Sequence, residues 1–202
     1  MTNSKAGFTR VALYGGAFDP VHDAHLRVAS YALKQVGLER VLFIPSAQSP
    51  LKQNPPRASD EERVEMLELA TDGERRYRVE TYEVEKGGIS YTFETVLHFS
   101  QEYPNAELFW MVGADQFEQL DRWRNIEALA GRVTFLVFGR PGYSHQACDI
   151  PGLKYFTVDA PQMDESSTDI RRLRRAGESV TGMLPVAVEA FISEEGLYTG
   201  VE

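Results

Sequence analysis

The stretch Gly15-Gly16-Ala17-Phe18-Asp19-Pro20-Val21-His22-Asp23-Ala24-His25 decides the fold of this chain. It follows the short apolar run Val11–Tyr14, and an amphipathic helical pattern continues from it to Val36. This order predicts a strand, a glycine turn and a helix. The backbone N–H groups of such a turn, together with the positive end of the helix dipole, can bind a polyphosphate.

The helix has its own start and stop signals. We expect Asp19 to be the N-cap, Pro20 to occupy the first helical position and Gly37 to end the helix. His22 and His25 would then add hydrogen-bond donors on one helix face. Two histidines three residues apart can also be a surface coincidence. They are too few for a zinc site, and the stretch is not a G-x-G-x-x-G fingerprint, so a hydride-transfer enzyme is not indicated.

Apolar strand candidates alternate with helical patterns along the whole chain. The expected strands are Val11–Tyr14, Val41–Ile44, Tyr77–Val84 near a sheet edge, Leu108–Val112, Val133–Phe138 and Tyr155–Val158. The expected helices cover 20–36, a segment opened by the capping box Ser59-Asp60-Glu61-Glu62, and 92–103, 116–130, 169–176 and 185–195. This order predicts an α/β fold with a mainly parallel sheet and helices on both faces.

Ligands of such sheets bind beyond the carboxyl ends of the strands, near the switch point of the strand order. We therefore expect the chemistry in the loops after the first, second, fourth, fifth and sixth strands, where the polar motifs fall. The chain shows no internal repeat or long linker. We expect one domain over 1–202, with a core from about 11 to 198.

Composition limits the partners. The net charge of −9 argues against nonspecific binding to nucleic acid or to an acidic membrane, so an anionic substrate would need a local basic pocket. No apolar run approaches the length of a membrane span, and the first ten residues lack the apolar core of a signal peptide. The one cysteine, Cys148, cannot form an intrachain disulfide, which fits a reducing cytoplasm.

A second motif is Ser166-Ser167-Thr168-Asp169-Ile170-Arg171, at the expected start of a helix. Thr168 or Ser167 can cap that helix, with Arg171 one turn in. An ordinary capped helix with a solvated basic face is one interpretation. The other is a second phosphate site made of hydroxyls, free N–H groups and an arginine, since this segment begins the densest basic cluster of an acidic protein.

The two motifs carry a family resemblance. GGAFDPVHDAH resembles the G-G-x-F-D-P-x-H-x-G-H signature of the nucleotidyltransferase α/β phosphodiesterase superfamily, and SSTDIR resembles its second motif, S-x-T-x-x-R. Further pieces are similar in order and approximate spacing to bacterial nicotinate-nucleotide adenylyltransferases: 89–92, 112–115, Trp123, 140–142, 184–185 and 196–198. The resemblance covers roughly Val11 to Tyr198 and implies a Rossmann-like, doubly wound fold.

The resemblance implies ATP-dependent adenylyl transfer to nicotinate mononucleotide, which gives deamido-NAD and pyrophosphate in NAD biosynthesis. ATP would be the co-substrate. Mg²⁺ would be held mainly by substrate phosphates and water, with no metal site built from protein side chains.

The same resemblance assigns roles to residues. The groups that would stabilise charge during catalysis are His22, His25 and Arg171. The residues that would bind the phosphates of ATP are Gly15, Gly16, Ala17, Phe18, Lys52, Ser166, Ser167 and Thr168. The adenosine side would be Gly113, Asp115 and Arg140, and the pyridine nucleotide would meet Thr92 and Trp123. Asp115 and Arg140 could instead form a helix cap or a surface ion pair. Trp123 could instead be a packed core residue.

The sequence departs from the family pattern at four positions: Ala17 replaces a threonine or serine, Ala24 a glycine, Leu51 a histidine and Glu165 an isoleucine. Two alternatives therefore stay open. One is the same chemistry on another acceptor, such as nicotinamide mononucleotide or phosphopantetheine, although Trp123 and the 90–92 segment favour a pyridine nucleotide. The other is a catalytically silent nucleotide-binding or sensor protein.

Overall fold

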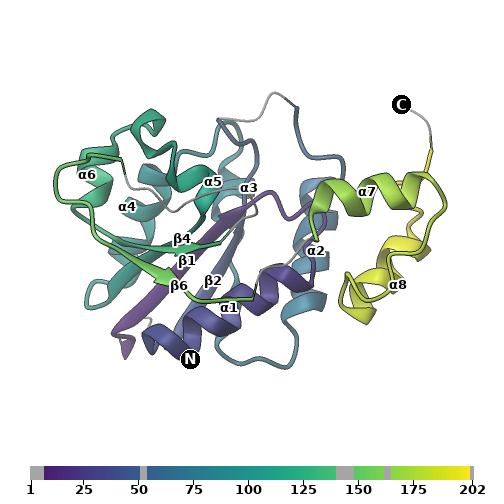
Figure 1. Ribbon diagram of the computed structural model, residues 1–202, viewed down its shortest axis with the longest axis horizontal. Helices are drawn as coiled ribbons and strands as arrows, with labels where there is room; N and C mark the ends of the chain where they lie inside the picture. The colour runs from purple at the N-terminus through teal and green to yellow at the C-terminus, as the bar shows by residue number, and fades with distance from the viewer. Residues whose placement is uncertain (1–6, 51–53, 140–147, 162–164, 201–202) are drawn as a thin grey trace.

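Six parallel strands form one sheet in a computed structural model, which describes residues 7–50, 54–139, 148–161 and 165–200 (Figure 1). The strand order is β3-β2-β1-β4-β5-β6. The strands are β1 (Arg10–Gly16), β2 (Arg40–Pro45), β3 (Tyr77–Val79), β4 (Glu107–Gly113), β5 (Thr134–Phe138) and β6 (Tyr155–Val158). The predicted fold class is confirmed.

The connections are mostly helical. The described helices are α1 (Asp23–Val36), α2 (Asp60–Thr71), α3 (Tyr82–Lys86), α4 (Thr92–Glu102), α5 (Ala114–Phe117), a 3₁₀ turn η2 (Leu120–Arg122), α6 (Ile126–Ala130), α7 (Ser167–Arg175) and α8 (Val186–Glu194). Within the described part of the chain, no helix has the length and apolar character needed to span a bilayer.

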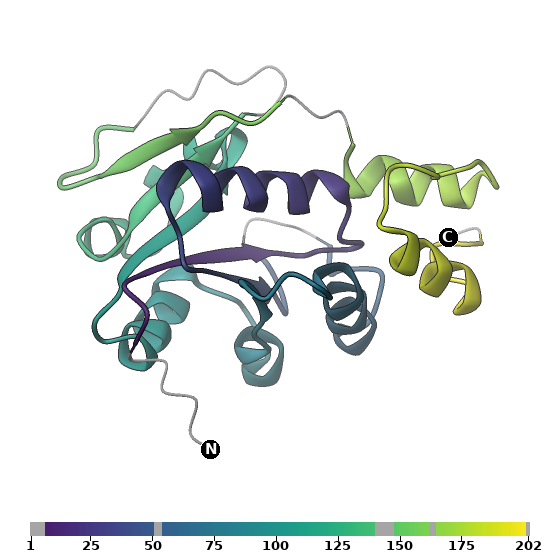
Figure 2. The same ribbon diagram turned by 90° about the horizontal axis from the view of Figure 1, so that it is seen from below.

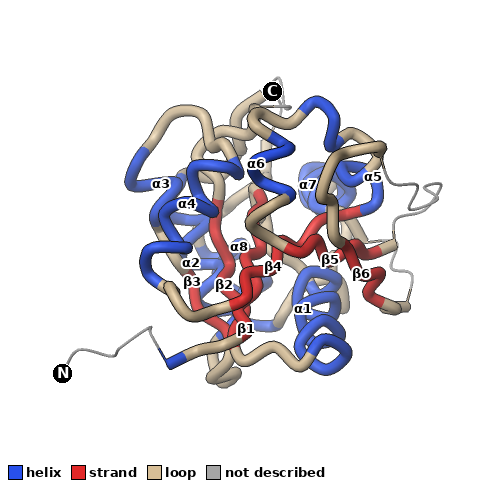
Figure 3. Tube along the Cα trace, turned by 90° about the vertical axis from the view of Figure 1, so that its left-hand side faces the viewer, coloured by secondary structure: helices blue, strands red, loops and turns tan. Residues whose placement is uncertain are grey.

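The sheet is buried on both faces because alternate residues of each strand point to opposite sides. Ala12 and Tyr14 belong to one apolar cluster, which includes most of the buried residues of α1. Val11 and Leu13 belong to the other, which includes the buried residues of α4 and α6. Figure 3 shows α1 on one side of the sheet and α4 and α6 on the other.

The strand order reverses direction at β1. The strand after β1 in the chain, β2, pairs on one side of it, and β4 pairs on the other. Beyond the carboxyl end of β1, the first turns of α1 and α7 lie side by side, and α8 lies close to α7 (Figure 2). The hydroxyl of Ser167 donates to the carbonyl of Pro20 at 3.0 Å, which joins the start of α7 to the turn before α1. The fold thus brings both sequence motifs to the switch point.

The predicted start of the first helix is wrong. The helix begins at Asp23 with His22 as its N-cap, and Gly37 ends it in the left-handed conformation as expected. Asp19 lies before the helix, where its 4% exposed carboxylate accepts three hydrogen bonds. The donors are the N–H groups of Arg57 at 2.8 Å and Ala58 at 3.0 Å and the hydroxyl of Tyr198 at 2.8 Å. Asp19 therefore ties the turn to two distant segments.

The expected strand Tyr77–Val84 is only half correct. β3 is an edge strand as predicted, but it ends at Val79 and is followed by α3, which Gly87 ends at a positive φ of 68°. Tertiary contacts outweigh the β-rich composition of this segment: Glu83 is buried and accepts a hydrogen bond from Thr95 of α4. The expected helical stretch 116–130 is likewise divided into α5, η2 and α6, with Asn125 at a φ of 57° just before α6.

Candidate active site

A two-lobed cleft opens at the carboxyl ends of the strands. One lobe is a cavity of about 490 Å³ that the turn after β1, the start of α5 and the start of α7 surround. The other is a cavity of about 300 Å³ between the same turn, the 90–92 segment and Trp123. Gly15, Gly16 and Ala17 line both, so the turn lies where the two lobes meet.

The larger lobe collects most of the residues expected to contact ATP. The predicted residues that line it are Gly15, Gly16, Ala17, Phe18, His22, His25, Gly113, Asp115, Ser166, Ser167, Thr168 and Arg171. Gly113 ends β4 and Asp115 lies in the first turn of α5. Lys52 and Arg140 lie outside the described residues.

Outside donors hold four carbonyl groups of the turn. The acceptor–donor pairs are Gly16 with the Ser46 N–H at 2.8 Å, Ala17 with Arg63 at 2.7 Å, Asp19 with Arg171 at 2.7 Å and Pro20 with Ser167 at 3.0 Å. A carbonyl oxygen that faced a phosphate would repel it, so engaging these oxygens suits the turn to an anion. Arg63 is fully buried and also bonds Asp60.

The two histidine rings lie against each other, with ring centroids 3.8 Å apart. The backbone N–H of His22 donates to Nδ1 of His25 at 3.2 Å. Because an accepting Nδ1 carries no proton, the proton of the neutral His25 ring is on Nε2. Phe18 packs edge-on against His25 at 5.0 Å between centroids. His25 is therefore held in one orientation in the wall of the larger lobe.

The second motif contributes its hydroxyls and one arginine. Ser166, rather than Ser167 or Thr168, caps α7, since its side chain accepts from the Asp169 N–H at 3.1 Å. Arg171 donates to the Asp19 carbonyl and, at 3.3 Å, to the Thr168 hydroxyl. Its guanidinium lies 3.7 Å from the Asp19 carboxylate. Arg171 thus joins the two motifs physically while it lines the cleft.

Packing explains why position 15 is a glycine, and the sequence alone does not reveal this. A Cβ built on Gly15 would lie 2.7 Å from two ring atoms of Trp110, which is shorter than any van der Waals contact. Trp110 is a buried residue of β4 whose ring also lines the smaller lobe. Gly15 thus lets the Trp110 ring lie directly under the turn.

We expect Gly15→Ala to lower the free energy of unfolding by about 1–3 kcal/mol, because the added methyl group must displace the Trp110 ring or the turn. Urea unfolding measures this loss. Gly131→Ala is the matched control, since its nearest atoms lie 3.8 Å away. Equal stability of the Gly15→Ala variant and the unsubstituted protein would contradict the packing argument.

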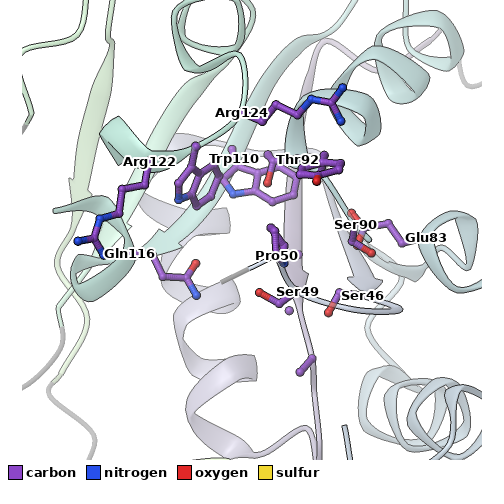
Figure 4. A pocket seen from close by; sticks show the side chains of 15 residues that line it. Ser46, Ser49, Pro50, Glu83, Ser90, Thr92, Trp110, Gln116, Arg122 and Arg124 are labelled. Atoms are coloured by element: carbon purple, nitrogen blue, oxygen red, sulfur yellow. The ribbon is translucent and has the colours of Figure 1, made fainter. Parts of the chain in front are cut away.

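The smaller lobe is aromatic with a basic rim. Trp123 packs edge-to-face on Trp110, with centroids 6.4 Å apart and an interplanar angle of 86°. Thr92, Arg122 and Arg124 also line this lobe. The guanidinium of Arg124 lies 4.6 Å from the ring centroid of Tyr91. Figure 4 shows the labelled side chains around this pocket.

Sequence reasoning missed several of these residues. Arg122 and Arg124 flank Trp123, so two basic residues beside one aromatic in an acidic chain were a readable signal. Trp110 and Glu83 gave no signal, because both fall in segments that read as strands. Glu83 is 5% exposed, and burial raises the pKa of its carboxyl group, while hydrogen bonds from Thr95 and Ser90 act in the opposite direction.

Comparisons with known proteins show the family of this chain. A family model described as cytidylyltransferase-like matches residues 13–173. The nicotinate-nucleotide adenylyltransferase of Bacillus subtilis is 36% identical over 189 residues, which cover 94% of this chain and 98% of that protein. The chain belongs to the nicotinate-nucleotide adenylyltransferase family. A probable nicotinate-nucleotide adenylyltransferase of Opitutus terrae is 37% identical, with 94% of this chain and 97% of that protein covered.

A solved structure supports the fold of this family member. The Plasmodium falciparum nicotinic acid mononucleotide adenylyltransferase complexed with NaAD superposes with a TM-score of 0.76, covering 94% of this chain and 97% of that chain. The sequence identity in this pair is 16%, so the likeness concerns the fold.

Proposed function

We infer that this chain transfers the adenylyl group of ATP to nicotinate mononucleotide and so makes deamido-NAD and pyrophosphate for NAD biosynthesis. The observation that carries this inference is the two-lobed cleft, in which a polar lobe and an aromatic lobe meet at Gly15–Ala17. The reaction needs the phosphate oxygen of one anionic nucleotide to lie in line with the α-phosphorus of the other. The family membership points to the same activity.

The chemistry needs alignment and charge stabilisation rather than a strong base. The acceptor's phosphate is already an anion near neutral pH, so its oxygen can attack the α-phosphorus directly. The bond from that phosphorus to the bridging oxygen breaks, and its electron pair leaves on pyrophosphate. We propose that His25, with Nε2–H as donor, and His22 stabilise the charge that develops on these oxygens.

The remaining polar groups of the larger lobe would bind the other phosphates. We propose that Arg171, Ser166 and Thr168 hold the β- and γ-phosphates at the start of α7, supported by their position in the cleft wall. Gly113 and Asp115 would lie along the adenosine, with Asp115 accepting from a ribose hydroxyl. Lys52 and Arg140, outside the described residues, keep their proposed roles beside the phosphates and the adenine.

We propose that Mg²⁺ enters this site as an ion carried by ATP. Among the described residues, no group of three His, Cys, Asp or Glu side chains is arranged to hold a metal ion. We propose that Mg²⁺ is bound mainly by ATP oxygens and water, where it would neutralise phosphate charge.

We also propose that residues 1–202 form one domain and that the protein acts in the cytoplasm. The one sheet of the described residues supports the first proposal, and the presence of one cysteine, Cys148, supports the second.

The acceptor would occupy the smaller lobe. We propose that the pyridine ring stacks on Trp123 and that Thr92, the first residue of α4, meets the ring carboxylate. The first N–H groups of a helix have no acceptor within it and favour an anion. Arg122 and Arg124 line the rim of this lobe. Their positive charges would attract an anionic acceptor that the net negative charge of the protein otherwise repels.

Trp123→Ala should raise the KM for nicotinate mononucleotide about tenfold or more, because stacking on an aromatic side chain contributes about 1–3 kcal/mol. The KM for ATP should stay within about twofold. Trp123→Phe keeps a ring and should show a smaller rise. Steady-state kinetics with each substrate varied measures both constants. A rise in the KM for ATP alone would place Trp123 on the wrong side of the cleft.

An acceptor panel tests the function itself. Pyrophosphate release is measured with ATP and, in turn, nicotinate mononucleotide, nicotinamide mononucleotide and phosphopantetheine. We expect release to be fastest with nicotinate mononucleotide. Equal or faster turnover of the amide would overturn the acid preference. ATP binding without release for any acceptor would favour the silent nucleotide-binding protein.

A further inference from the structure

Glu83 is a buried acid in the wall of the smaller lobe that the adenylyl-transfer chemistry does not use. It comes from α3, and its side chain is directed toward Ser90 at one end of this pocket (Figure 4). A buried carboxyl group is costly unless it is hydrogen-bonded. Its partners therefore indicate what it does.

Glu83 joins three segments through two hydroxyl groups. The hydroxyl of Thr95, in the first turn of α4, donates to Oε1 of Glu83 at 2.5 Å. The hydroxyl of Ser90 also bonds the Glu83 carboxylate. The same Ser90 hydroxyl accepts from the N–H of Ala47 at 3.1 Å, and the Ser90 N–H donates to the carbonyl of Gln48 at 2.9 Å. Glu83 thus connects α3, α4 and the loop after β2.

These connections converge on the segment that, in the proposed function, faces the pyridine substituent. Ser90 lies two residues before Thr92, and Thr95 lies three residues after it. Gly87 and Gly88, which precede this segment, both have a positive φ near 70°. A carboxyl group that bonds both hydroxyls fixes the segment from both sides of Thr92.

We propose that Glu83 is a positioning residue that sets the pocket's choice between a carboxylate and a carboxamide on the pyridine ring, by holding Ser90 and Thr95 so that the start of α4 keeps one orientation. The proposal rests on the proposed function. Backbone N–H groups at a helix start complement a carboxylate, whereas the NH₂ of a carboxamide needs an acceptor. The hydroxyls of Thr95 and Ser90 direct the Glu83 carboxylate toward the protein, so the start of α4 rather than Glu83 would meet the pyridine substituent.

The test compares Glu83→Ala, Glu83→Gln and Glu85→Ala. Glu85 lies on the same short helix but is exposed, and it bonds Thr81. Glu83→Ala should raise the KM for nicotinate mononucleotide about tenfold, as expected for losing hydrogen bonds to a charged group, and leave the KM for ATP within about twofold. The acid-to-amide ratio of kcat/KM should fall by a similar factor. Glu83→Gln keeps an oxygen for Thr95 and should recover most of both losses.

Several results would overturn the proposal. They are an unchanged KM for nicotinate mononucleotide in Glu83→Ala, an equal rise in both KM values with a lower melting temperature, and failure of Glu83→Gln to recover the acid preference. If Glu83→Ala does not fold, Thr95→Val removes one donor with little change of shape and should raise the same KM about threefold.

Calorimetry separates this proposal from the proposed function. The affinities of the unsubstituted protein and Glu83→Ala for the acid and the amide are measured without ATP, so no turnover is needed. If the unsubstituted protein binds the acid preferentially but releases no pyrophosphate, the proposed reaction fails while the Glu83 comparison still stands. If the reaction proceeds and both proteins show the same acid-to-amide ratio, the Glu83 proposal alone is wrong.

Discussion

Replacing His25 with alanine is expected to lower kcat about 100-fold or more, because the variant loses the donor that we propose stabilises charge developing in the transition state. The His22 N–H holds Nδ1 of the ring, so the donor at Nε2 is already oriented before ATP binds. The affinity for ATP should change much less, because the proposed contacts of the bound phosphates with the turn and with Arg171 remain in the variant. Single-turnover kinetics and calorimetry measure the two effects separately.

The matched control is His98→Ala. His98 stacks on Tyr82 at 3.9 Å between centroids and lines neither lobe of the cleft. Its loss should leave kcat within about twofold. If kcat of His25→Ala stays within about fivefold of the unsubstituted protein, His25 is not the transition-state donor, and the silent interpretation gains weight.

The second large effect is expected at Arg171. Arg171→Ala should lower kcat/KM for ATP about 100-fold, because it removes a charge from the larger lobe, where we propose that the phosphates bind, and frees the Asp19 carbonyl of the turn. Arg171→Lys keeps the charge but replaces the two guanidinium nitrogens that bond Asp19 and Thr168 with a single ammonium nitrogen, so we expect an intermediate value. Steady-state kinetics at fixed, saturating nicotinate mononucleotide gives both numbers.

Arg172→Ala supplies the control from the adjacent position. The Arg172 side chain is 63% exposed and lies 3.7 Å from Asp169, so its loss removes a cation of the same helix without touching the cleft. We expect nearly unchanged kinetics. If kcat/KM for ATP falls equally in Arg171→Ala and Arg172→Ala, activity depends on the overall positive charge of this helix rather than on the hydrogen bond between Arg171 and Asp19.

Local patterns were sufficient to predict most of the fold. The capping box at Ser59 and Glu62 and the left-handed Gly37 are found where the sequence places them, because both signals act within one helical turn. The alternation of strands and helices predicted the parallel sheet, and the ends of its strands do form the cleft. Two motifs about 150 residues apart meet there.

Long-range contacts explain what the sequence could not predict. Asp19 looks like a helix cap, but its partners Arg57 and Tyr198 are 38 and 179 residues away. Gly15 looks like a phosphate glycine, and its contact with Trp110 becomes visible only when β4 is placed beside β1. Glu83 lies in a β-rich segment, and its burial depends on Thr95 of a later helix.

The fate of the α-phosphorus tests the central claim most directly. The protein is incubated with nicotinate mononucleotide and with ATP that carries a label at the α-phosphorus, and the products are separated. We predict that the label appears in deamido-NAD in step with the pyrophosphate released. Label that stays in ATP, or that is recovered as free AMP, would contradict adenylyl transfer by this cleft.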